Sequence, residues 1–254
     1  MILTFLGTGT SQGIPVVACD CNVCQSSDPR DKRLRSSVMV ETEGKRIIID
    51  CGPDFRQQML REDIRSIDAI LITHAHKDHI GGLDDVRAFN YILQRPAAVY
   101  ASREVQQAIK TEFFYAFEED KYPGVPEIDL HLIGNRRFEA AGLSILPVEA
   151  LHYKDHHVFG YRIGDLTYIT DAISITEKEM NKVEGSKVIV INALRRKKHY
   201  SHFNLEEAVS ILEQLKPEQG YLTHISHQLG RYEDVQMELP SFIKQSYDGL
   251  RVVV

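Results

Sequence analysis

The chain has 254 residues, of which 43% are apolar, and a formal net charge of -6. This length suits one large domain or two closely packed halves with a sizeable core, and the charge does not favour nucleic acid as the main partner. No apolar stretch is long enough for a membrane span and the first residues lack the basic part of a signal peptide, so we expect a cytoplasmic protein without membrane contact.

Short strands and turns are predicted over the first fifty residues. The pattern indicates strands at 2–6, 37–41 and 46–50, with a hairpin turn at Glu43-Gly44 between the last two. Asp54 is expected to cap a helix that runs to about residue 61.

Three of the four cysteines lie close together, at Cys19, Cys21 and Cys24. Neighbours this close pair poorly with one another as disulfides, so a soft metal is the better explanation for the cluster. Cys51 lies among isoleucines and is expected to be a small buried residue.

A buried strand at 69–72 leads into the segment 73–82, THAHKDHIGG. Alternate side chains of an extended backbone point the same way, so His74 and His76 can converge on one metal ion as the strand ends. Asp78 and His79 then lie in the turn and can face a second ion. The two glycines that follow let the backbone bend into a helix.

The HxHxDH pattern followed by two glycines resembles the signature of the metallo-β-lactamase-fold hydrolases. That resemblance implies one or two metal ions at the edge of a β-sandwich. It says little about the substrate.

The rest of the chain alternates predicted strands and helices, with no linker or low-complexity segment. We predict strands at 98–101, 130–133, 143–149, 159–163, 166–170, 187–191, 221–223 and 250–253. We predict helices at 83–93, from about 103, from about 176, at 205–215 and at 229–239. The aromatic segment 113–128 is expected either to pack in the core or to form a lid beside the metal site.

Strands run in series before helices in both parts of the chain, which suits two packed sheets with helices outside. We therefore predict an α/β protein with the four-layer αβ/βα sandwich of the metallo-β-lactamase fold. We expect a single domain over 1–254, with two packed halves that divide near residue 135, and we expect the strand at 130–133 to open the second half.

Later strand ends should complete the metal centre if the resemblance holds. His152 follows one apolar run, Asp171 ends the next strand and matches the carboxylate that bridges two ions in the family, and His224 follows the strand at 221–223. The implied ligands are His74, His76, His152 and Asp171 for one ion, and Asp78, His79, His224 and the shared Asp171 for the other. Two divalent ions, zinc or manganese, are favoured over one. His156 and His157 are expected to lie in a nearby loop.

His227 follows His224 by three residues, so both cannot easily reach the same cluster. With Cys19, Cys21 and Cys24 it would complete a Cys₃His structural zinc site with no open position. This combination resembles the PhnP family of phosphoribosyl cyclic phosphodiesterases, whose members carry such an accessory zinc beside a two-metal centre. Similarity extends over most of the chain, through 5–11, 35–37, 50–54 and 82–87, although Cys51 replaces the more usual Thr or Ser.

The resemblance implies hydrolysis of a small cyclic phosphate or nucleotide-like phosphodiester through a metal-bridging hydroxide. Asp78 and His202 are the implied catalytic residues, with His202 giving a proton to the leaving alkoxide and His199 as the weaker alternative. The basic run at 195–198 is interpreted either as a solvated turn or as an attraction for a phosphorylated substrate.

Two other functions stay open. An RNase Z-like nuclease that trims tRNA 3′ ends shares His202 and the GTGT motif, but the sequence has no long basic, glycine-rich arm. A non-catalytic accessory or ligand-binding protein of the same fold is the second alternative, and the complete ligand set argues against it. Hydrolysis of a thioester or lactam is less favoured, because those branches lack the cysteine cluster. A homodimer is compatible with the resemblance, since dimers are common among relatives.

Overall fold

A computed structural model describes all of residues 1–254. Along the chain, strands and helices alternate in two series. The first series contains the strands β1 (Ile2–Gly7), β2 (Ser37–Thr42), β3 (Lys45–Ile49), β4 (Ala69–Leu71), β5 (Ala97–Ala101) and β6 (Ile128–Leu132). Its helices are α1 (Phe55–Arg61), α2 (Lys77–Ile80), α3 (Arg87–Leu93) and α4 (Arg103–Glu112). Short 3₁₀ turns occur at η1 (Pro29–Asp31), η2 (Leu83–Val86) and η3 (Phe114–Ala116).

The second series begins with a run of antiparallel strands. Its strands are β7 (Phe138–Ala140), β8 (Leu143–Tyr153), β9 (His156–Ile163), β10 (Leu166–Tyr168), β11 (Val188–Asn192), β12 (Gln219–Thr223) and β13 (Ile243–Gln245), and β14 (Arg251–Val253) ends the chain. Its helices are α5 (Glu177–Val183), α6 (Leu205–Leu215) and α7 (Tyr232–Glu238). None of the helices is long and apolar enough to cross a membrane.

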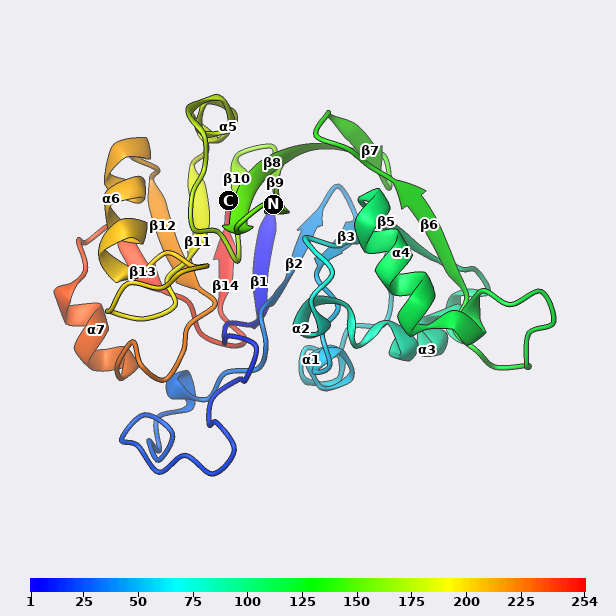
Figure 1. Ribbon diagram of the computed structural model, residues 1–254, viewed down its shortest axis with the longest axis horizontal. Helices are drawn as coiled ribbons and strands as arrows, with labels where there is room; N and C mark the ends of the chain where they lie inside the picture. The colour runs from blue at the N-terminus through cyan, green and yellow to red at the C-terminus, as the bar shows by residue number, and fades with distance from the viewer.

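Two seven-stranded sheets form the centre of the molecule. One has the order β14-β1-β2-β3-β4-β5-β6 and the other the order β13-β12-β11-β10-β9-β8-β7. In Figure 1, α6 and α7 lie at the left of the strands and α1 to α4 at the right, with β14 beside β1 near both termini. The predicted four-layer αβ/βα sandwich is therefore confirmed.

Side-chain alternation along the strands produces the layers. In β3, Ile47 and Ile49 belong to the core between the sheets, whereas Ile48 packs against the first set of helices. In β11, Val188 and Val190 face the core between the sheets, and Ile189 packs in the core under the second set of helices. Strands that are buried on both faces explain the apolar runs in the sequence.

Several sequence predictions need correction. The strand predicted at 130–133 to open the second half is β6, which pairs in parallel with β5 and so belongs to the first sheet. The helix predicted at 83–93 begins as the 3₁₀ turn η2 and becomes α-helical only at Arg87. Asp54 precedes α1 but makes no side-chain cap, because its carboxylate accepts hydrogen bonds from Arg35 instead.

The aromatic segment at 113–128 contributes to the core and not to the cavity described below. Phe113 and Ala116 are buried in the core cluster of the first sheet, and the Tyr115 hydroxyl donates to the Asp84 carboxylate at 2.7 Å. No residue of the segment lines the cavity, so the core alternative is the one the packing supports.

Strand ends meet where the two sheets open. The strands β3, β4 and β5 are parallel to one another, as are β10, β11 and β12. Carboxyl ends of adjacent parallel strands lie at the same edge of a sheet, which is where open α/β sheets place their binding sites. The segments that follow β3, β4, β10 and β12 carry Asp50, His74, Asp171 and His224.

Candidate metal centre

Three histidines form the first ligand cluster. His74, His76 and His152 each bring one ring nitrogen within 4.8 Å of the others. The Nε2 of His74 and the Nδ1 of His76 are 3.0 Å apart, and a strand irregularity between Leu151 and Tyr153 aims His152 at them. The Nδ1 of His152 donates to the Ser201 carbonyl at 2.9 Å, which leaves its Nε2 free to bind a metal.

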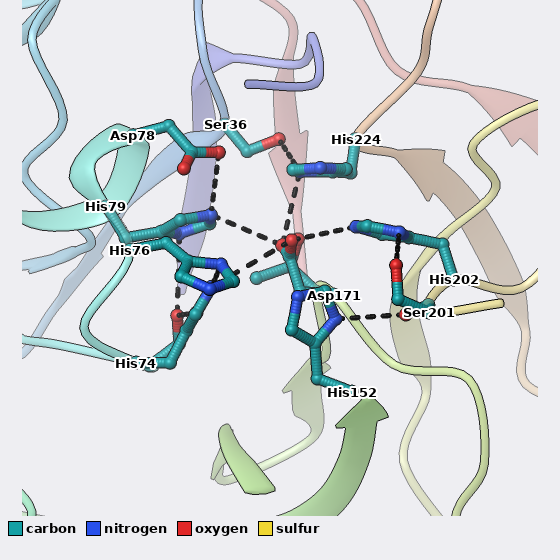
Figure 2. Close-up of polar contacts among 12 residues, drawn as sticks. Ser36, His74, His76, Asp78, His79, His152, Asp171, Ser201, His202 and His224 are labelled. Carbon is teal, nitrogen blue, oxygen red and sulfur yellow. Dashed lines mark hydrogen bonds and ion pairs between the residues drawn. The ribbon is translucent and has the colours of Figure 1, made fainter. Parts of the chain in front are cut away.

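Asp171 lies between that cluster and a second one, made by Asp78, His79, Asp171 and His224 (Figure 2). Its Oδ2 is 3.3 Å from His79 Nε2 and 3.2 Å from His224 Nδ1. Its Oδ1 is 4.0 Å from His74 Nε2 in the first cluster. One carboxylate thus faces both clusters, as the sequence predicts for a bridging residue.

The imidazole nitrogens and carboxylates of both clusters suit a divalent cation. The buried His79 Nε2 is 3.2 Å from Asp78 Oδ2 and 3.3 Å from Asp171 Oδ2, yet it makes no hydrogen bond of good geometry with either. A buried polar atom without a partner is costly, and a shared cation would satisfy all three groups. This donor set is suited to Zn²⁺, Mn²⁺ or Fe²⁺.

Burial keeps two of the histidines neutral. It lowers the pKa of both His152 and His224 to about 4. A metal binds the neutral imidazole, so these rings are in the binding form at neutral pH. The pKa of Asp78 falls to about 2 in spite of its burial, because the neighbouring His79 favours the carboxylate.

The backbone is strained at the same strand ends. Asp50, Asp171 and His224 have φ angles of 67°, 57° and 54°, in the left-handed region that few residues other than glycine adopt. Such conformations persist where the surrounding structure holds them, and they cluster at functional sites. In this conformation Asp50 contacts His79, and Asp171 contacts His224.

Asp50 is a supporting residue that the sequence reasoning did not single out. Its carboxylate is 2.7 Å from His79 Nδ1 and also accepts hydrogen bonds from the amide and hydroxyl of Thr73. The sequence contained a signal for Asp50, because this residue ends the strand that lies next to the strand leading into the histidine segment. The Ser201 carbonyl that holds His152 has no such signal, because a backbone acceptor leaves no mark in the sequence.

His202 lies against the Asp171 carboxylate. Its Nε2 is 3.0 Å from Asp171 Oδ1, and its Nδ1 is 2.8 Å from Ser201 Oγ and 3.2 Å from His199 Nδ1. His152, Asp171 and His202 also bring ligand atoms within 4.8 Å of one another. The position therefore suits either a proton donor or a further metal ligand.

The cysteine cluster converges on His227. The Nδ1 of His227 is 3.3 Å from the sulfurs of Cys19 and Cys21 and 3.6 Å from that of Cys24. A hydrogen bond from the Cys24 amide lowers the pKa of Cys21 to about 6, whereas burial raises the pKa of Cys24 to about 11. Four such groups within 4.8 Å match the donor set of a structural zinc site.

A polar cavity of about 710 Å³ opens above both clusters. It is lined by His76, Asp78, Asp171, His202 and other polar side chains, and also by Tyr153, Tyr200 and Arg195. The Tyr153 and Tyr200 rings meet edge to face with centroids 5.3 Å apart. Its size and polar lining suit a small, charged ligand.

His156 and His157 do not lie in a loop as predicted. A two-residue turn joins β8 to β9, and β9 begins at His156. The His156 ring stacks on His76, with centroids 5.3 Å apart, and lines the cavity. The alternate residue, His157, points away and lies 3.5 Å from Glu149.

Comparisons with known proteins agree with this geometry. Residues 45–225 match the β-lactamase superfamily domain. The crystal structure of a diphosphatase from the PhnP family is 41% identical, with a TM-score of 0.93, over 100% of this chain and 97% of that one. Zinc-bound PqqB from Methylobacterium extorquens is 19% identical with a TM-score of 0.80 over 100% of both chains, which shows a shared fold.

A longer relative also matches. An octanoyltransferase of Porphyromonas gingivalis is 40% identical over 252 residues, which are 98% of this chain and 51% of that protein. The chain thus spans about half the length of this relative, whose name describes the whole of it.

Proposed function

The chain belongs to the PhnP family within the β-lactamase superfamily, and from this membership we propose that it is a metal-dependent phosphodiesterase. The proposed substrate is a small cyclic phosphate or a nucleotide-like phosphodiester. The observation that carries the proposal is the position of Asp171, which faces two clusters of metal-binding groups and also lies 3.0 Å from His202 at the floor of an open cavity.

We assign the two clusters to two divalent cations and the cysteine cluster to a structural zinc. His74, His76 and His152 hold one cation, Asp78, His79 and His224 hold the other, and Asp171 is shared. Cys19, Cys21, Cys24 and His227 hold the zinc. When bound, the two cations would polarise the phosphoryl oxygens and favour ionisation of a water molecule at neutral pH.

His202 supplies a proton to the departing alkoxide in this proposal. The water oxygen forms the new P–O bond and releases a proton to bulk solvent, the ester P–O bond breaks, and the leaving oxygen takes the proton from His202 Nε2, which solvent then restores. Asp171 Oδ1, 3.0 Å from Nε2, and Ser201 Oγ, 2.8 Å from Nδ1, fix the orientation of the His202 ring. Asp78 serves both as a ligand and as a negative charge beside the reacting group.

The test is hydrolysis of bis-p-nitrophenyl phosphate and a panel of cyclic phosphates by protein loaded with Mn²⁺ or Zn²⁺. His76→Ala should lower kcat/KM at least a hundredfold. The matched control is His157→Ala, because this histidine is 54% exposed and points away from the cavity. Metal-loaded protein that binds a cyclic phosphate tightly but cleaves none of the panel would instead be an accessory binding protein.

A further inference from the structure

Four of the five histidines assigned to the two shared cations have a polar group behind the ring. One ring nitrogen of each faces the other ligands, and the second nitrogen lies within hydrogen-bond distance of a protein oxygen. Such a partner fixes the orientation of a ligating ring and supports metal affinity. The partners are Thr73 Oγ1 for His74 at 3.0 Å, Asp50 Oδ2 for His79 at 2.7 Å, the Ser201 carbonyl for His152 at 2.9 Å and Thr10 Oγ1 for His224 at 3.2 Å.

His76 is the exception. Its Nδ1 faces His74 Nε2 at 3.0 Å, and apart from this contact its ring makes no hydrogen bond with the protein. His76 is exposed, whereas His74 and His152 in the same cluster are buried. It precedes α2, and its side chain does not cap that helix. The orientation of this ring must therefore depend on another kind of contact.

The ring of His156 makes that contact. It stacks on His76 with the planes 17° apart and the centroids at 5.3 Å, and its edge meets the rings of His74 at 6.1 Å and His152 at 5.9 Å. The Nε2 of His156 is buried without a hydrogen-bond partner. A histidine retained for a hydrogen bond from Nε2 would have such a partner, so the ring face is what His156 offers to its neighbours.

The backbone holds His156 independently of any ion. It opens β9 and pairs with Tyr153 of β8 across the two-residue turn. Its Nδ1 is also 3.6 Å from Glu104 Oε1, at the start of α4. The flat surface against which His76 lies is thus fixed by the sheet.

We propose that His156 is a positioning residue, whose stacked ring holds His76, the exposed ligand of the three-histidine cluster, in the orientation that binds a cation. The inference rests on the metal centre of the proposed function and not on the reaction at that centre. The stack gives His76 the order that hydrogen bonds give the other four rings. A ligand that is ordered in advance loses less conformational entropy when it binds.

The test is competition for Zn²⁺ between metal-free protein and a chromophoric chelator. His156→Ala should lower the affinity for the ion at the three-histidine cluster by about two- to tenfold, the range expected for one lost aromatic contact. His156→Phe keeps an aromatic face without the ring nitrogens and should restore most of the affinity. His157→Ala removes the neighbouring histidine, which lies beside Glu149 instead, and should bind like the wild type.

Two further readouts separate positioning from a general loss of stability. Thermal unfolding of the metal-free variants should be close to that of the wild type, and the affinity of the cysteine cluster should not change in any of them. Wild-type affinity in His156→Ala would overturn the inference. So would a His156→Phe variant that binds no better than His156→Ala, because a ring nitrogen would then be required.

The outcome for the proposed function is read separately. A wild-type protein that binds no ion beyond the one at the cysteines would overturn both this inference and the proposed metal centre. No substrate enters the measurement. Protein that cleaves no phosphodiester but shows the expected order of affinities would therefore remove the proposed activity and leave the role of His156 standing.

Discussion

Asp50 Oδ2 lies 2.7 Å from His79 Nδ1, and both side chains are fully buried. The carboxylate is itself fixed by the amide and hydroxyl of Thr73. In this arrangement the proton of His79 is on Nδ1, which donates a hydrogen bond to Asp50. The other ring nitrogen, Nε2, is directed at Asp78 and Asp171. A carboxylate behind a ligating histidine orients the ring and makes it a better donor to the metal.

Asp50→Asn should therefore weaken metal binding without removing a ligand. We expect a loss of about ten- to a hundredfold in affinity, because the amide carries no charge to support His79. Competition with a chromophoric chelator measures the metal affinity. The ion proposed for the cysteine cluster serves as an internal control, since Asp50 does not contact that cluster. An unchanged affinity for all ions would contradict the role of Asp50.

His202→Ala should leave the metal content intact and slow the hydrolysis of diesters with poor leaving groups most. A good leaving group, such as p-nitrophenolate, departs without a proton, whereas an alkoxide needs one. The measurement is kcat/KM for an aryl and an alkyl diester, together with metal analysis. Equal slowing of both substrates would refute the general-acid role, and loss of an ion would make His202 a ligand.

The fold was largely predictable because both sheets contain apolar strands whose ends can be recognised in the sequence. The predictions failed where the local sequence pattern does not determine which neighbouring strand a strand pairs with. β6 reads as a strand in either sheet, and only its parallel pairing with β5 assigns it to the first. The edge strands β7 and β13 are three residues each, which is too short for a periodic signal.

The candidate site was predictable as far as its side chains follow strand ends. His74, Asp171 and His224 could be found in this way, and the structure brings them together. Arg195 was one of four basic residues in a run, and the sequence could not show that its neighbour Arg196 pairs with Glu238. Which residue of a charged run faces a cavity depends on tertiary contacts made by distant residues.

Cys21→Ser should lower stability more than it lowers intrinsic turnover. The cysteine cluster joins the loop at 19–24 to His227, and a structural zinc contributes its binding free energy to folding. Thermal unfolding and kcat of the surviving folded fraction are the measurements. Cys51→Ser is a useful comparison, since Cys51 is buried away from the cluster and should not change the zinc content. A large fall in kcat at unchanged stability would assign the cysteine-bound metal to catalysis.

Metal analysis of well-loaded protein should find close to three ions per chain. We propose that two of them share Asp171, which faces both histidine clusters, and that the third lies at the cysteines. Inductively coupled plasma mass spectrometry gives the total, and repeating it on Cys21→Ser and His76→Ala shows which site each ion occupies. A total of two or fewer would remove either the cysteine site or one ion of the shared pair.

Glu179 connects α5 to β8, and its substitution should destabilise the protein in a pH-dependent way. Burial raises the pKa of Glu179, but hydrogen bonds from Lys182 and from the Glu149 amide outweigh this effect and leave it below its usual value. A carboxyl whose pKa is lower in the folded state stabilises the protein above its unfolded pKa, and this contribution disappears as the pH falls through the folded pKa. Glu179→Gln should therefore lower the free energy of unfolding by about 1–3 kcal/mol at neutral pH and by less in acid.

Urea unfolding of the variant and the wild type at each pH measures this difference. The control is Asp165→Asn, which removes one partner of the exposed ion pair with Lys187 and should not change the midpoint of unfolding. A cost that stays constant down to strongly acidic pH would show that Glu179 acts through packing and not through its charge.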